Sequence, residues 1–264
     1  MCMTTTKCTD NLEQFRQSVY QNFNNRADTL MELVDAIGSM PNAGSIVEYS
    51  LAPCFRRSYS TIFKGINEMD WDEMGIADLL APYLPEPRQQ AFWLLGTDVT
   101  SQARPFAKTL ADRSMVYQPN MVSGNKPVTV GHQYSTTGLL PEVEEGVSSS
   151  WVVPLMTRRV RTDEDKEMVG AKQMDRLLTD PHLPFGQGLC VEVGDTSYSK
   201  PAYLHANRHH PNLVTITRAR GTRVFYRQFA PQEPGQANQP VGHPTWYGQR
   251  FSLKEPESWP ERFD

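Results

Sequence analysis

The sequence predicts an α/β core that follows a helical N-terminal region, and three observations support this fold class. Apolar residues recur at helical spacing through residues 10–84. The composition then changes after Pro85-Glu86-Pro87, where short apolar runs typical of strands begin. Helices therefore come first, followed by three or four strands, one helix and further strands. This order is typical of a mixed sheet with flanking helices.

The N-terminal region shows apolar side chains at steps of three and four, the pattern of amphipathic helices. The first run extends from Phe15 to Ile37 and ends at Gly38 and Pro41. A second run extends from Ile46 to Ile66, and Pro53 either kinks it or marks its start. A short third piece covers 74–84. The region is acidic overall, which favours a helical bundle with solvated faces.

Beyond the helical region, two apolar runs each end in an aspartate. Ala91–Asp98 and Gly188–Asp195 both have the length and composition of short buried strands. Residues 162–179 between them have a clear helical pattern, with acidic residues in the first turn, where they suit the helix dipole. Further extended segments share an apolar, β-branched or aromatic character: 128–130, 134–140, 151–161, 213–217 and 224–226.

The two aspartates are the candidate catalytic and metal-binding residues. Ligands of α/β sheets gather at the carboxyl ends of strands, so adjacent strands would place Asp98 and Asp195 side by side. Two close carboxylates need a shared proton or cation. Oxygen ligands without a Cys/His cluster favour Mg²⁺ or Mn²⁺. On this pattern alone, a turn-forming or helix-capping role for either residue stays open.

Charge placement favours a phosphate-bearing substrate. The chain has a formal net charge of −4, yet residues 196–232 contain no Asp or Glu. Six basic residues in this stretch are the predicted DNA-binding set: Lys200, Arg208, Arg218, Arg220, Arg223 and Arg227. Tyr198, Tyr203, Phe225 and Tyr226 are interleaved with them. A basic surface beside a metal site fits a polyanion, and the alternative is a basic face that only balances the acidic helix.

The remaining motifs indicate little chemistry. His205, His209 and His210 lie near Pro211, so we expect loop or DNA-facing histidines rather than a metal cluster. The four cysteines have no zinc-type spacing and suit a reduced protein. No G-x-S-x-G, P-loop or G-x-G-x-x-G motif is present. The sequence has no signal peptide and no transmembrane stretch, so we expect a soluble, cytoplasmic protein.

Several of these motifs together resemble the DDE insertion-sequence transposases. Phe92–Thr100 is similar to the strand that bears the family's first Asp, and Gly188–Ser199 to the strand that bears the second. Leu213–Arg220 looks like the next strand. Phe15–Ile66 looks like the N-terminal region of such transposases, and Gly242–Leu253 like the opening of their insertion domain.

The resemblance implies a fold, a reaction and a location. The fold would be an RNase H-like mixed sheet with flanking helices, preceded by a helical domain. Asp98 and Asp195 would hold Mg²⁺ or Mn²⁺ for strand cleavage and transfer at transposon ends. The attacking group would be a water and then a DNA 3′-hydroxyl. Double-stranded DNA is the implied partner, a homo-oligomer is a further expectation, and the bacterial nucleoid is the implied place of action.

The family's third carboxylate is a Glu on a helix after the insertion, and no matching pattern follows Asp195. Glu233, Glu255, Glu257 and Glu261 lie in Pro-rich surroundings. The resemblance therefore implies a C-terminally truncated chain that is inactive by itself. The expected divisions are a helical domain at 1–85, the first part of the catalytic core at 86–230 and the start of an insertion domain at 231–264.

Two other functions stay open. The first is a non-catalytic DNA-binding remnant of a transposase, which needs the basic surface but no metal. The second is a metal-dependent phosphoesterase of another fold. It would require further ligands in the same cleft, with His132 or His205 as candidates.

Overall fold

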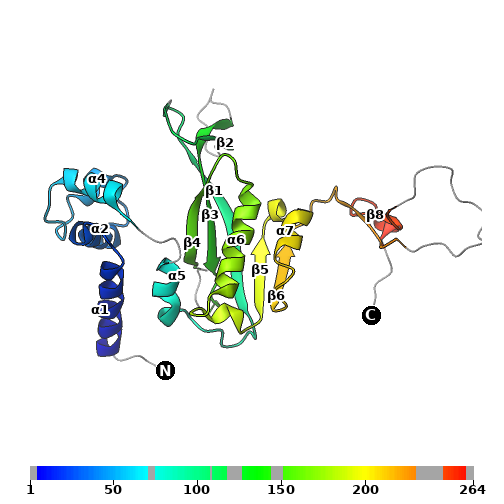
Figure 1. The fold of residues 1–264 in the computed structure, drawn as a ribbon, viewed down its shortest axis with the longest axis horizontal. Coiled ribbons are helices and arrows are strands. Elements are labelled where there is room, and N and C mark those ends of the chain that lie inside the picture. The colour runs from blue at the N-terminus through cyan, green and yellow to red at the C-terminus, as the bar shows by residue number, and fades with distance from the viewer. Residues whose placement is uncertain are drawn as a thin grey trace, which may run out of the picture.

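The structure is a computed structural model that describes residues 5–70, 75–107, 109–117, 127–143, 151–229 and 246–259. Side chains are described from residue 9 onward. An N-terminal group of helices lies beside a central mixed sheet, and a small two-stranded ribbon lies on the other side (Figure 1). Within the described residues, no helix combines the length and the apolar character that a membrane crossing needs.

The N-terminal helices pack around a small core of their own. They are α1 (Thr5–Gln21), α2 (Ala27–Ser39), α3 (Ile46–Tyr49) and α4 (Tyr59–Glu68). The buried side chains of this core are Leu33, Ala36, Ala52, Phe55 and Ile62. The second predicted helical run is in fact two helices, because turns at 50–58 around Pro53 interrupt it.

The fifth helix packs in the core of the central sheet, not in the core of the N-terminal helices. The helix α5 (Gly75–Leu80) and the 3-10 turn η1 (Ala81–Tyr83) follow the N-terminal helices in the chain. Ala77 of α5 is fully buried in the core beneath the sheet. The described part of residues 10–84 is thus helical as expected, but the first predicted run from Phe15 to Ile37 is also two helices, because residues 22–26 separate α1 from α2. A domain boundary at residue 85 stays a prediction.

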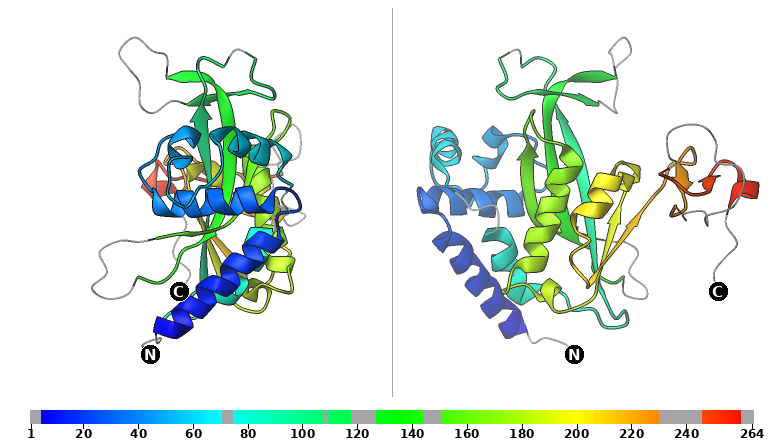
Figure 2. Two further views of the ribbon diagram at one scale, coloured as in Figure 1. Left: turned by 90° about the vertical axis from the view of Figure 1, so that its left-hand side faces the viewer. Right: turned by 45° about the vertical axis from the view of Figure 1, so that its right-hand side comes forward.

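The central sheet has the strand order β2-β3-β1-β5-β6, and β4 also pairs with β3. Its strands are β1 (Trp93–Ala103), β2 (Ser114–Tyr117), β3 (Val128–Leu139), β4 (Val153–Val160), β5 (Cys190–Gly194) and β6 (Leu213–Thr217). The neighbours β1, β5 and β6 are parallel, whereas β3 runs antiparallel to β1, β2 and β4. Both β2 and β4 pair along the edge of β3 away from β1, at different heights (Figure 2).

The helix α6 (Lys166–Thr179) covers one face of this sheet (Figure 1). Its buried Met174 and Leu177 pack with Leu95, Leu139 and Leu155 in the main core. Gly170 allows close approach, since a Cβ there would lie 2.7 Å from Cγ2 of Thr97. A mixed sheet of this topology with flanking helices confirms the expected RNase H-like fold.

Five details differ from the sequence-based expectations. The segments 128–130 and 134–140 form one long strand, and β1 extends past Asp98 to Ala103. The strand β2 and the short helix α7 (Pro201–Ala206) were missed. The strand β7 (Val224–Tyr226) leaves the main sheet and pairs with β8 (Arg250–Ser252), followed by the 3-10 turn η4 (Pro256–Ser258).

Candidate active site

Three parallel strands place three charged residues at one level of the sheet. Thr97 of β1 pairs with Gly194 of β5, which pairs with Thr217 of β6. The next residues along the chain are Asp98, Asp195 and Arg218. Because neighbouring strands lie about 4.8 Å apart, the two aspartates are adjacent. This register places the two aspartates on neighbouring strands at one level of the sheet, and a shared cation between their carboxylates stays a prediction.

Asp98 does not end its strand, contrary to the expectation from its apolar run. It lies within β1 and is paired with Thr136 of β3. It is, however, the first residue of β1 beyond the pairing with β5. Side chains alternate along a strand, so Asp98 points away from the buried Thr97 and is exposed. Among the described residues, no hydrogen bond or ion pair reaches the Asp98 carboxylate.

Asp195 caps the 3-10 turn η3 (Thr196–Ser199) directly after β5. Its Oδ1 accepts hydrogen bonds from the backbone N of Ser197 at 2.8 Å and from the Ser197 hydroxyl at 2.6 Å. Partial burial acts to raise the pKa of Asp195, but the Ser197 hydrogen bonds and the charge of Lys166 outweigh it and hold the pKa below its ordinary value. Asp195 is therefore an ionised carboxylate at neutral pH.

Tyr198 packs against Gly194, the residue before Asp195, and was not recognised as a site residue. Its side chain is 1% exposed, and its hydroxyl has no hydrogen-bond partner among the described residues. Burial raises the pKa of Tyr198, and the charges of Asp98 and Asp195 raise it further. Tyr198 is thus a neutral, buried group whose pKa both carboxylates raise.

Two further acids near Tyr198 have protein partners. Glu192 of β5 accepts hydrogen bonds from the hydroxyls of Thr97, Tyr203 and Thr215. Glu167 of α6 is paired with Lys200 at 2.8 Å. Within the described part of the chain, no third acid or histidine gathers with Asp98 and Asp195 into a metal-binding group.

The six predicted DNA-binding residues have different surroundings. Lys200 is held by Glu167 and Asp165, and Arg223 donates to Ser199 at 3.2 Å. The remaining four are exposed: Arg208 after α7, Arg218 and Arg220 after β6, and Arg227 after β7. Whether these residues bind DNA stays a prediction.

The aromatic residues of the basic stretch divide into two kinds. Tyr198 and Tyr203 are buried in a small core with Ala171, so they support the fold rather than a surface. Phe225 and Tyr226 of β7 are 40% and 49% exposed. Only the second pair is accessible to a partner.

The histidines do not gather at the carboxylate pair. His132 contacts the carbonyl of Ala111 at 2.9 Å, and His205 is exposed on α7. The convergence that a phosphoesterase of another fold would need is therefore not seen among the described residues. His209 and His210 lie in the turn after α7, as expected of loop histidines, and both approach Asp175, a partner that the sequence did not indicate.

The residues at the register level fit a hard divalent cation by their chemistry. Both donors are carboxylates: Asp195 is ionised and hydrogen-bonded, and Asp98 is exposed and has no partner within the described ranges. Two such charges on adjacent strands repel each other unless a cation or proton lies between them. Oxygen ligands of this kind suit Mg²⁺ or Mn²⁺.

An RNase H-like sheet with a carboxylate pair on its central strands defines a class of nucleic-acid-processing nucleases. Comparison with family models gives the particular family: the DDE superfamily endonuclease model matches residues 18–263. The chain belongs to this family of endonucleases. DDE endonucleases generally use divalent metals and act on DNA. Among curated proteins, none matches the chain.

Proposed function

We propose that the chain is a DDE-type transposase that cleaves and transfers DNA strands at insertion-sequence ends with Mg²⁺ or Mn²⁺. The observation that carries the proposal is the shared register level of Asp98 and Asp195 on parallel neighbours β1 and β5. The family match supports the nuclease chemistry. Transposon ends, oligomerisation and action at the bacterial nucleoid are parts of this proposal.

Each carboxylate has a separate part in this function. Asp195 is kept ionised by Ser197, and Asp98 presents an exposed carboxylate at the same level. Together they would hold the metal, which stabilises the charge on the attacking and leaving oxygens of phosphoryl transfer when bound. Arg218 follows β6 at this level and is exposed, so it can contact a backbone phosphate.

Plasmid nicking tests this function directly. Supercoiled DNA is incubated with the chain and Mg²⁺ or Mn²⁺, alongside Asp98→Asn and Asp195→Asn. If the two carboxylates suffice for cleavage, the wild-type chain nicks DNA only with the metal and neither variant nicks above background. No nicking by all three proteins would instead agree with the expectation that the chain is inactive by itself. Asp10→Asn on the exposed face of α1 makes the same chemical change far from the pair and should nick normally. Full nicking by Asp195→Asn would overturn the metal assignment.

A second function, DNA binding without cleavage, is supported by the exposed arginines at 208, 218, 220 and 227. It predicts a DNA complex that weakens with salt and is unaffected by Asp98→Ala, with no nicking under any metal. Plasmid nicking and the salt dependence of DNA binding therefore separate the two functions. The third carboxylate of the family, and the expected truncation, stay predictions.

A further inference from the structure

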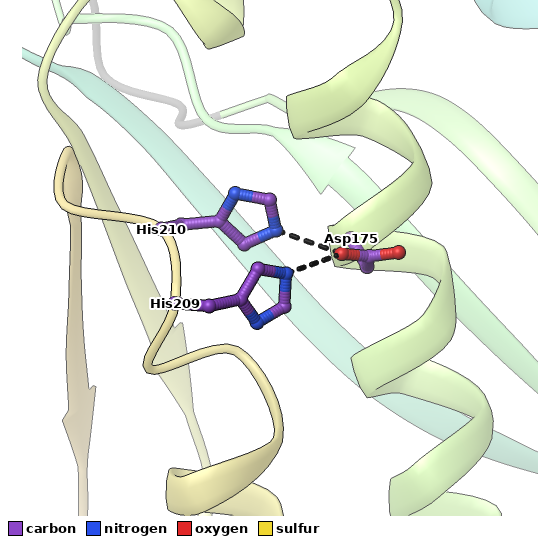
Figure 3. A group of neighbouring side chains, drawn as sticks. All are labelled: Asp175, His209 and His210. Atoms are coloured by element: carbon purple, nitrogen blue, oxygen red, sulfur yellow. Dashed lines mark hydrogen bonds and ion pairs between the residues drawn. The ribbon is translucent and has the colours of Figure 1, made fainter.

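A second group of metal-binding side chains lies on the far end of α6 from the carboxylate pair. Asp175 comes from α6, and His209 and His210 come from the turn between α7 and β6 (Figure 3). The Nε2 atoms of His209 and His210 lie 3.0 Å and 2.8 Å from Oδ1 of Asp175. One ligand atom from each residue lies within 4.8 Å of the other two. One small cation can therefore contact all three.

The hydrogen bond on the other side of the His209 ring selects Nε2 as the ligand. Nδ1 of His209 lies 3.2 Å from the carbonyl oxygen of Ala206. A carbonyl only accepts, so Nδ1 carries the hydrogen and Nε2 of the neutral ring has a lone pair. Metal-binding histidines commonly donate their second ring nitrogen to a backbone carbonyl in this way.

This tautomer leaves two acceptors facing each other. The lone pair of His209 Nε2 and the carboxylate oxygen of Asp175 are 3.0 Å apart. They attract only when a proton or a metal cation lies between them. Either a proton on Nε2 of His209 or a metal cation at the point where the three ligand atoms converge satisfies this contact.

The surroundings leave room for that species and for water. A cavity of about 270 Å³ is lined by Asp175 and His209 together with Met168, Ala171, Lys172, Ala206 and Asn207. Lys172 is exposed, so its ammonium can remain in water away from the ligands. Side-chain exposures of 59% for His209 and 44% for Asp175 give access from solvent.

We propose that Asp175, His209 and His210 form a zinc site that fastens the α7–β6 turn to α6. Two imidazoles and one carboxylate are a ligand set that Zn²⁺ accepts, with water in the fourth position. Imidazole ligands also favour Zn²⁺ over Mg²⁺. The turn is already tied to α6 by Asn207, which donates to the carbonyl of Ala171 at 3.0 Å. Bound metal would strengthen that attachment.

This site is separate from the proposed nuclease site and does not depend on it. Asp175 is nine residues along α6 from Lys166, the lysine whose charge acts on Asp195. That spacing corresponds to roughly 13 Å along the helix axis. The histidines precede β6, whereas Arg218 and the carboxylate pair lie at its other end.

Zinc titration of the metal-free full chain, followed by calorimetry and thermal unfolding, tests the proposal. We expect one equivalent of Zn²⁺ to bind and to raise Tm. Losing even an outer-shell partner typically lowers metal affinity by about 10–100-fold, so His209→Gln and His210→Gln should each weaken binding by at least ~10-fold. His205→Gln on exposed α7 is the matched control and should bind like the wild type.

The carboxylate pair provides the second control. Asp98→Asn should retain the zinc-induced rise in Tm, since its carboxylate belongs to the other site. His209 is largely exposed, so its variant should fold even where substitution of the more buried His210 does not. Equal zinc affinity of His209→Gln and wild type would overturn the proposal, as would loss of zinc binding in Asp98→Asn alone.

Discussion

The rings of Tyr198 and Tyr203 pack edge to face with their centroids 4.9 Å apart, but their hydroxyls have opposite surroundings. The Tyr203 hydroxyl donates to the buried carboxyl of Glu192. The Tyr198 hydroxyl is equally buried and has no partner among the described residues. Because of this difference, the contribution of the Tyr203 hydrogen bond to stability can be compared with that of the neighbouring unpartnered Tyr198 hydroxyl.

Removing the two hydroxyls should have different effects on the free energy of unfolding. Tyr203→Phe leaves a buried carboxyl short of a donor and should lower the free energy of unfolding by about 1–3 kcal/mol. Tyr198→Phe removes a group that is buried without a partner, so it should leave that free energy unchanged or raise it by about 1 kcal/mol. Urea unfolding of the wild type and both variants measures these free energies. Equal losses would show that Tyr198 has a bonding partner.

Gly170 is expected to be essential for packing α6 on the sheet. A Cβ at this position would lie 2.7 Å from Cγ2 of Thr97 and 3.3 Å from Cε1 of Tyr198. Gly170→Ala should therefore lower the free energy of unfolding by about 1–3 kcal/mol, the usual cost of overpacking. Thermal unfolding with circular dichroism measures it.

Gly38 in α2 is the matched control, since a Cβ there would meet nothing within 4 Å. Gly38→Ala should stabilise the chain by about 0.5–1 kcal/mol, because alanine loses less conformational entropy in a helix. Stabilisation of both alanine variants would contradict the close approach of α6 to β1.

The N-terminus of α6 depends on Asp165. This side chain accepts hydrogen bonds from the backbone N of Glu167 at 3.0 Å and of Met168 at 3.1 Å. Asp165→Ala should cost about 0.5–2 kcal/mol. Asp163→Ala, an exposed neighbour without a capping role, should stay within about 0.5 kcal/mol of the wild type. Chemical denaturation measures the loss of stability in both variants. Equal losses would show that Asp165 does not cap α6.

The buried Glu192 should make stability depend on pH. Burial raises the pKa of Glu192 above its ordinary value of 4.5, despite opposing hydrogen bonds from Tyr203, Thr97 and Thr215. The folded chain thus binds this proton more tightly than the unfolded chain. Its contribution to stability is fully present below the ordinary pKa and is lost as pH rises through the raised value.

Glu192→Gln removes that ionisation while keeping the shape of the side chain. The stability difference between the Gln variant and the wild type should therefore move in favour of Gln as pH rises from about 4.5 towards neutrality. Urea unfolding across this range measures the difference. Glu257→Gln in η4 is exposed and should follow the wild-type curve. A difference for Glu192→Gln that does not vary with pH would show that this carboxyl has no raised pKa.

Much of the fold was predictable because its signals are local. Helical periodicity located α6, and apolar runs ending in Asp98 and Asp195 located β1 and β5. The same periodicity also found the helical region of α1 and α2 but missed the break between them at residues 22–26. The extent of β1 was not predictable, because residues 99–103 are only half buried and owe their extended form to pairing with β3. The strand β2 was missed for the same reason, since only Val116 of its four residues is buried.

The site was predictable in part. The carboxylate pair follows from sequence order once β1 and β5 are neighbours. Tyr198 has no such signal, because its packing against Gly194 depends on the 3-10 turn that Asp195 caps. Asp175 and the two histidines are separated by a strand and a helix in the chain, and only the packing of α7 against α6 brings them together. The position of the histidines beside Pro211 indicated a loop but not this partner.

Mn²⁺ binding at the carboxylate pair tests the central claim most directly. The measurement uses electron paramagnetic resonance of free Mn²⁺, in a His209→Gln/His210→Gln background that removes the second site. We expect Asp98→Asn and Asp195→Asn each to weaken Mn²⁺ binding by at least ~10-fold, whereas Asp10→Asn leaves it unchanged. Undiminished Mn²⁺ affinity in both carboxylate variants would contradict the claim that these side chains hold one cation between them.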